Sequence, residues 1–157
     1  MITPSHEAGR IVLSVNCKWS MEVFYPHPGS YKIKGLEMRR EDIPLQSVEE
    51  RVFINQTGGD KRLRGVIGEV RMSRLGYWKV GSISRDMMKM LYCNQKEIED
   101  YAGDKGRVWL YQYSSPQLYW KTRPLADFGI SHIPQFYAYA QCSFEELETI
   151  RMEGIRS

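Results

Sequence analysis

The sequence has few cysteines and few histidines, and both shortages exclude kinds of site. Its 157 residues include three of each. Cys17, Cys93 and Cys142 are far apart, odd in number and without C-x-x-C spacing, a pattern that excludes a disulfide framework and a zinc site. We expect three reduced thiols. The histidines have no metal-ligand spacing either, so we expect no metal site and no cofactor.

Long apolar runs are also missing. A membrane-spanning helix needs about 20 consecutive apolar residues, and no run in this sequence approaches that length. The first ten residues, with Pro4, His6, Glu7 and Arg10, lack the apolar core of a signal peptide. We therefore expect a cytoplasmic protein with no membrane partner.

Charge of one sign is not in large excess. The 22 Lys and Arg against 19 Asp and Glu leave a formal charge of +3, which by itself does not require a nucleic-acid partner. The cations are nevertheless clustered, in residues 32–40 and again in residues 61–74, where Glu69 is the one acid. Such clusters are typical of a basic binding surface, but also of the solvated face of a strand.

The pattern of apolar residues predicts one domain of mixed secondary structure. With 42% hydrophobic and 26% charged residues, the chain is long enough for one core. About six short strands and two to four short helices predict an α+β domain, or a small, partly open barrel flanked by helices. The strands are expected at residues 11–15, 36–39, 51–57, 63–75, 107–113 and 136–140, helices at 17–24, after Ser84, at 94–103 and at 143–152, and a long loop at 114–134.

The stretch "KIKGLEMRR", residues 32–40, places a carboxylate among four cations. Leu36 and Met38 alternate with Glu37 and Arg39, as in a half-buried strand. Because side chains alternate across a strand, Glu37 and Arg39 lie on one face.

The order of motifs resembles the ASCH domain family of the PUA-like superfamily. The resemblance begins at "IVLSVNCKW", where Lys18 opens the next helix, and continues at "KIKGLEMRR", where Lys34, Glu37 and Arg39 match the family's Lys/Glu/Arg element. It resumes at "RVFINQT", "LRGVIGEV", "EIEDYAG" and "PLADFGISHIPQFYAYA". It covers residues 11–141, leaving residues 1–10 as a leader and 142–157 as a C-terminal helical tail. Gly35 departs from the family pattern, in which a Lys-Thr pair is usual.

The resemblance implies a small PUA-like β-barrel of about six strands flanked by short helices, and a domain that binds nucleic acid, most readily RNA, or a modified nucleoside. In that interpretation Glu37, at the centre of a basic cleft, accepts hydrogen bonds from exocyclic amines of a base. The cations hold phosphate, Trp19 stacks on a base, and an amide near the last strand approaches the cleft. The expected ligand-binding residues are Lys18, Trp19, Lys34, Glu37, Arg39 and Gln135.

Two alternatives remain open. Some relatives hydrolyse acetylated cytidine with a Lys, a Thr and a Glu, and Glu37 occupies the position of that Thr. A carboxylate cannot replace the hydroxyl nucleophile without forming an anhydride, so a hydrolase would use Lys34 and Glu37 as its catalytic pair, with Glu37 as the base for a water. The other alternative is an interaction domain without a nucleotide ligand, whose basic patch is only a solvated surface. Without a ligand, Lys34, Glu37 and Arg39 form a structural ion-pair network. Separately, Glu97, Glu99 and Tyr101 are expected on a solvated helix face, with Tyr101 as an anchor.

Overall fold

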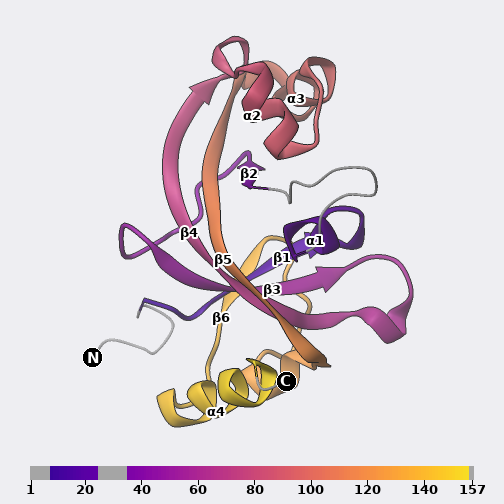
Figure 1. The fold of residues 1–157 in the computed structure, drawn as a ribbon, viewed down its shortest axis with the longest axis vertical. Helices are drawn as coiled ribbons and strands as arrows, with labels where there is room; N and C mark the ends of the chain where they lie inside the picture. Colours follow the sequence, from indigo (N-terminus) through magenta and orange to yellow (C-terminus); the bar gives the residue numbers. More distant parts are fainter. Residues whose placement is uncertain (1–7, 25–34, 156–157) are drawn as a thin grey trace.

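Six strands and four α-helices make up the part of the chain that the structure describes. The computed structural model describes residues 8–24 and 35–155 (Figure 1). No helix in this part of the chain is long and apolar enough to cross a membrane. The strands are β1 (Ile11–Asn16), β2 (Leu36–Arg39), β3 (Glu50–Thr57), β4 (Gly65–Lys79), β5 (Arg107–Arg123) and β6 (Tyr137–Tyr139), and the helices are α1 (Cys17–Phe24), α2 (Arg85–Leu91), α3 (Gln95–Ala102) and α4 (Phe144–Ile155).

The strands form one sheet in the order β2-β5-β4-β3-β1-β6. Only β1 and β3 pair in parallel; the other neighbours are antiparallel. The predicted α+β class and six strands are confirmed, but the sheet does not close into the predicted barrel. Within the described residues its edges are β2 and β6, short strands that pair on one side each. Short edges of this kind offer little backbone for further pairing.

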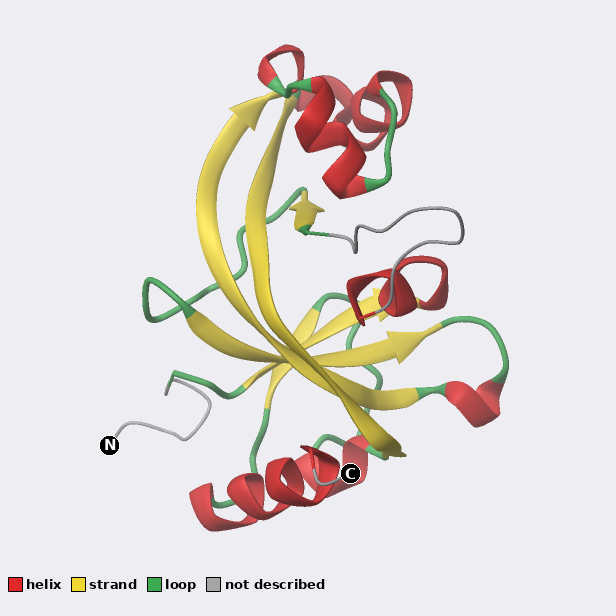
Figure 2. Ribbon diagram, viewed as in Figure 1, coloured by secondary structure: helices red, strands yellow, loops and turns green. Residues whose placement is uncertain are grey.

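A long ribbon of β4 and β5 connects the two ends of the molecule. Figure 2 shows both strands curving from α4 at one end to α2 and α3 at the other. The sequence predicted a loop over residues 114–134, and this was wrong for 114–123, which continue β5. Pro116 suggested a break, but it lies at an irregularity in the β4–β5 pairing, next to Ser115 with a φ of +48°. A proline is tolerated at a bulge, where the ladder loses a hydrogen bond anyway.

Helix ends follow the sequence signals closely. The α2 helix begins with a serine cap, where Ser84 Oγ accepts from the Met87 amide at 3.2 Å. At α4 there is a capping box: Ser143 Oγ accepts from the Glu146 amide at 3.1 Å, and Glu146 Oε1 accepts from the Ser143 amide at 3.3 Å. Local sequence thus determines where these helices begin.

Three apolar clusters fill the described part of the chain, one for each layer of helices. The first lies between α1 and the sheet and is built around Ile11, Leu13 and Ile54. A second packs α4 against the sheet through Leu147 and other residues. The third joins α2 and α3 to the upper ribbon. The ribbon therefore carries a separate small core at each end.

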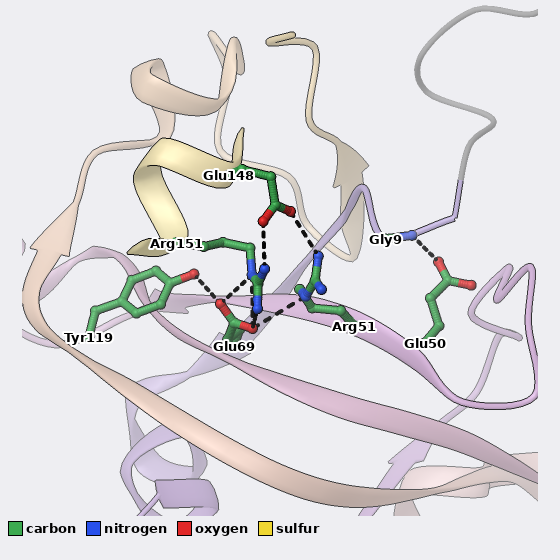
Figure 3. Close-up of polar contacts among 7 residues, drawn as sticks. All are labelled: Gly9, Glu50, Arg51, Glu69, Tyr119, Glu148 and Arg151. Atoms are coloured by element: carbon green, nitrogen blue, oxygen red, sulfur yellow. Dashed lines mark hydrogen bonds and ion pairs between the residues drawn. The ribbon is translucent and has the colours of Figure 1, made fainter. Parts of the chain in front are cut away.

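A buried ionic network, shown in Figure 3, attaches α4 to the sheet. Arg151 of α4 donates from Nε to Glu69 Oε1 and from Nη2 to Glu69 Oε2, both at 2.9 Å. Tyr119 Oη donates to the same carboxylate at 2.9 Å, and Arg51 Nε lies 3.4 Å from Oε2. Glu148 bridges the two arginines from the helix. The Glu69 side chain is only 7% exposed, so its charge depends on these partners.

We predict that Glu69→Gln destabilises the protein by about 3 kcal/mol, because removing one member of a buried ion pair leaves its partners uncompensated. Urea unfolding followed by circular dichroism measures the change. Asp60→Asn is the matched control, since it removes the solvent-exposed pair of Asp60 with Arg62 and is expected to leave the midpoint unchanged. Equal effects of the two substitutions would contradict the structural importance of the network.

Tyr119 makes the stability of this network dependent on alkaline pH. Burial raises the pKa of Tyr119 far above its usual value, and the Glu69 carboxylate raises it further. Above pH ~10 the unfolded chain therefore loses the tyrosine proton while the folded chain keeps it, so stability falls as pH rises.

For Tyr119→Phe we predict a loss of about 1–2 kcal/mol at pH 8, because a hydrogen bond to a charged group is removed. Above pH ~10 the difference from the wild type shrinks by up to about 1.4 kcal/mol per pH unit, since the variant cannot ionise here. Denaturant unfolding at intervals from pH 8 to 11 measures both. A difference that stays constant over this interval would refute the assignment.

Candidate functional site

A cavity of about 370 Å³ lies between the two halves of the molecule. One wall comes from the ends of β1 and β3, from α1 and from the loop before β6. The opposite wall comes from β2, the end of α2 and one face of α3. Its volume is in the range of small-molecule sites. The lining residues are Ser14, Val15, Asn16, Trp19, Glu37, Met38, Arg39, Thr57, Leu91, Cys93, Glu97, Tyr101 and Gln135.

Glu37 and Arg39 form an ion pair at the centre of this cavity. Arg39 Nε donates to Glu37 Oε2 at 2.7 Å, and the Glu37 side chain is 5% exposed. The pair follows directly from the strand alternation in β2, which places both side chains on the same face. The predicted common face is therefore confirmed.

Arg39 also ties the two walls together. Its Nη2 donates to the main-chain carbonyl of Ser14 in β1 at 2.9 Å, and its guanidinium lies 5.5 Å from the centre of the Phe136 ring. Burial alone would lower the pKa of Arg39, but the adjacent Glu37 carboxylate raises it above the usual arginine value. Arg39 is thus a permanent cation. Its Nε and Nη2 groups already donate to acceptors in the protein, and it holds Glu37 in place.

Tyr113 of β5 lies behind Glu37. Burial raises the pKa of Tyr113 well above its usual value, and the charge of the nearby Glu37 carboxylate raises it further. The phenol therefore stays protonated. Glu37 thus has a cation and a neutral phenol as neighbours.

Ser14 fixes the loop that carries Gln135. Its Oγ donates to the Pro134 carbonyl at 2.7 Å and accepts from Asn55 Nδ2 at 3.2 Å. Gln135 is exposed and borders the cavity directly after this anchor. The loop that carries Gln135 is therefore held by a hydrogen bond to β1, whose end forms part of the cavity wall.

An aromatic side chain flanks the carboxylate on the α1 side. Trp19 lines the cavity and also packs against the main apolar cluster. Lys18 is exposed, and its Nζ lies 4.7 Å from the centre of the Trp19 ring. Lys18 itself is not among the lining residues, so it borders the mouth through Trp19.

The opposite wall is formed by α3. Glu97 serves in the helix cap, accepting from the Asn94 amide at 3.0 Å. Tyr101 is anchored from outside by Arg40, whose Nε donates to its carbonyl at 2.6 Å and whose guanidinium lies 4.5 Å from its ring. Burial raises the pKa of Tyr101 as well. The sequence had placed both residues on a solvated helix face, and their position on the cavity was missed.

Four of the six expected ligand-binding residues thus meet around one cavity: Trp19, Glu37, Arg39 and Gln135. Lys34 lies outside the described residues. Among the lining residues that the structure describes, Arg39 is the one cation, opposed by the carboxylates of Glu37 and Glu97. In that part of the lining the cavity is less basic than the expected cleft.

No group of three or more His, Cys, Asp or Glu side chains in residues 8–24 and 35–155 is arranged to hold a metal ion. The residues lining the cavity offer hydrogen-bond donors and acceptors, an aromatic face and a fixed carboxylate. Such a set suits a planar, polar organic ligand.

Comparison with known proteins identifies the architecture. No protein-family model and no curated protein sequence matches this chain. Solved structures of the ASCH protein from Zymomonas mobilis do match: a serine-to-alanine variant at a TM-score of 0.70, with 16% identity over 92% of this chain and 96% of the other. A tyrosine-to-phenylalanine variant matches at a TM-score of 0.69, with 16% identity over 90% of this chain and 96% of the other. The unsubstituted protein matches at a TM-score of 0.68, with 15% identity over 92% of this chain and 94% of the other. Nearly the whole of both chains is superimposed, and this protein therefore has the ASCH-domain fold.

Proposed function

We propose that the cavity binds a base of single-stranded nucleic acid, with RNA as the expected form, and that Glu37 recognises the base. The observation that carries the proposal is a buried carboxylate held beside an aromatic wall in a cavity of nucleoside size. An ionised carboxylate accepts from the exocyclic amines of cytosine and adenine, and it discriminates against bases that lack such a donor. The ASCH-domain fold is consistent with nucleic-acid binding.

Each wall has a separate role in this proposal. Trp19 provides a face for stacking, which accepts any base. Glu37 then provides selectivity, and Arg39 positions it. Arg39, which the sequence suggested for phosphate binding, is here a positioning residue, because its Nε and Nη2 donate to Glu37 and to the Ser14 carbonyl.

The hydrolase alternative, with Lys34 and Glu37 as the catalytic pair, fits this geometry less well. A general base must have an oxygen free to accept a proton from the attacking water. In Glu37 the Oε2 atom already accepts from Arg39 Nε at 2.7 Å. Base recognition needs only an ionised acceptor, so a binding role makes fewer chemical demands on Glu37 than a catalytic role does.

We predict that Glu37→Gln changes base preference. A hydrogen bond to a charged group contributes about 1.5–3 kcal/mol, so affinity for oligocytidine and oligoadenosine should fall by roughly 10- to 100-fold. Affinity for oligouridine should change little. Fluorescence anisotropy with labelled decamers measures all three, and DNA decamers in parallel test the preference for RNA.

Glu99→Gln is the matched control for this experiment. Glu99 is an exposed carboxylate on α3 that does not line the cavity. Its substitution should leave the order of base preference unchanged. A uniform loss for all three homopolymers in Glu37→Gln would count against base recognition by this carboxylate.

Trp19→Ala should weaken binding of all decamers alike. Stacking contributes about 1–3 kcal/mol per base, which corresponds to roughly 5- to 150-fold in affinity. Trp19→Phe retains a stacking face and should recover much of the loss. Thermal melting of both variants separates this effect from the packing of Trp19 against the core. If the alanine variant binds like the wild type, the base does not stack on this wall.

A further inference from the structure

Three exposed cations lie outside the proposed base site, on two segments that adjoin its wall. Lys18 is at the start of α1, and Lys61 and Arg64 are in the loop between β3 and β4. We call these three residues the cationic rim. In Figure 1 the loop extends from the right-hand ends of β3 and β4, and α1 lies above β3.

Close packing holds the loop against the start of α1. A Cβ atom added to Gly58 would lie 2.8 Å from Asn16 Nδ2, and one added to Gly59 would lie 2.9 Å from Cys17 Sγ. Both glycines have a positive φ, +74° and +62°, so the backbone reaches this position where other residues would be strained. The loop and the helix therefore form one continuous surface.

The side chain of Arg64 folds back over the same contact. Its Nε donates to the Gly58 carbonyl and its Nη2 to the Gly59 carbonyl, both at 3.2 Å. These bonds hold the guanidinium at the two glycines that touch α1. Arg64 is thus positioned beside the helix that carries Lys18, although 46 residues separate them in the sequence.

Within the described residues the rim keeps an excess of positive charge, although Asp60 lies close enough to Arg64 to interact with it electrostatically. The acid of the loop, Asp60, is engaged by Arg62, whose Nη2 donates to Oδ2 at 2.7 Å. In the described part of the chain, neither Lys18, Lys61 nor Arg64 makes an ion pair with a carboxylate. A surface of this kind attracts anions, and it does so most strongly when several phosphates follow one another along a chain.

The rim continues directly from the cavity wall. Thr57 and Asn16 are register partners at the ends of β3 and β1, and both line the cavity. The residue after Thr57 is Gly58, where the loop begins, and Lys18 approaches the cavity through the face of Trp19. The loop therefore begins at the edge of the cavity wall.

The described lining of the cavity is unfavourable for phosphate, because it contains the carboxylates of Glu37 and Glu97. Its one cation, Arg39, is already paired with Glu37. We infer that Lys18, Lys61 and Arg64 bind the phosphates of nucleotides flanking the base in the cavity, so that the ligand is a single-stranded polynucleotide rather than a free nucleoside. This inference rests on the proposed function of the cavity. It assigns affinity to the rim and base selectivity to the cavity.

The test compares two triple variants of the full chain. Lys18→Gln, Lys61→Gln and Arg64→Gln together remove the rim. Lys79→Gln, Lys89→Gln and Lys121→Gln together remove the same charge from exposed positions elsewhere. Binding of a fluorescein-labelled RNA decamer of mixed sequence is measured from 50 to 300 mM KCl, with thermal melting to verify folding.

The rim variant should bind the RNA at least about tenfold more weakly at 100 mM salt, and the slope of log K against log salt should decrease in magnitude by about 2, since each phosphate contact on a single strand contributes about 0.7. The control variant should keep the wild-type slope. If the wild type binds RNA and the rim variant keeps its slope, the inference fails while the proposed function stands. If the wild type binds no RNA even at 50 mM salt, both fail.

Discussion

The antiparallel pairing of β4 with β5 is the constraint on which the other parts of this structure depend. These two strands run the length of the molecule, and they carry α2 and α3 at one end and α4 at the other (Figure 1). A ribbon of this length must bend, and it does so at register shifts near Gly76 and near Pro116. The bend brings β2 and α3 over the ends of β1 and β3. The cavity exists because the ribbon curves.

Charged residues then connect what the ribbon brings together, and they do so in two different ways. At α4 the Glu69 network is enclosed and joins four structural elements, β3, β4, β5 and α4, as expected of a network that attaches a helix to a sheet. In the cavity the pair of Glu37 and Arg39 also joins two elements, but it borders open volume. The same chemistry therefore stabilises one site and presents a fixed carboxylate in the other. Exposure to a cavity distinguishes the two cases.

The separate locations proposed for base and phosphate are consistent with the distribution of charge in the fold. The net charge of +3 is small, and the cations of the second basic segment, residues 61–74, have different surroundings in the fold. In the second segment Arg71 and Arg74 lie on the ribbon, and Arg74 is paired with Asp42, whereas Lys61 and Arg64 remain on an exposed loop. Counting cations in the sequence does not separate structural ones from those left for a ligand, because pairing depends on which acids the fold brings near.

Local rules accounted for the elements with short-range causes. The bounds of α1, the caps of α2 and α4 and the common face of Glu37 and Arg39 follow from capping and from the two-residue period of a strand, which act within a few residues. The continuation of β5 through Ser114–Arg123 was missed, because pairing with β4 overrides the local signal of Pro116. Likewise, sequence spacing did not indicate that Tyr101 and Glu97 face the same cavity as Ser14.

By itself, then, the sequence determined the α+β class, the order of elements and a carboxylate held on one strand face beside an arginine. Only the tertiary structure decided that this face borders a cavity, that the guanidinium of Arg39 is used to hold the walls together, and that Lys18 and Arg64 lie on one surface. The physical reason is that the first group depends on backbone periodicity and nearest neighbours. The second depends on contacts between residues tens of positions apart, which form only when the β4–β5 ribbon bends.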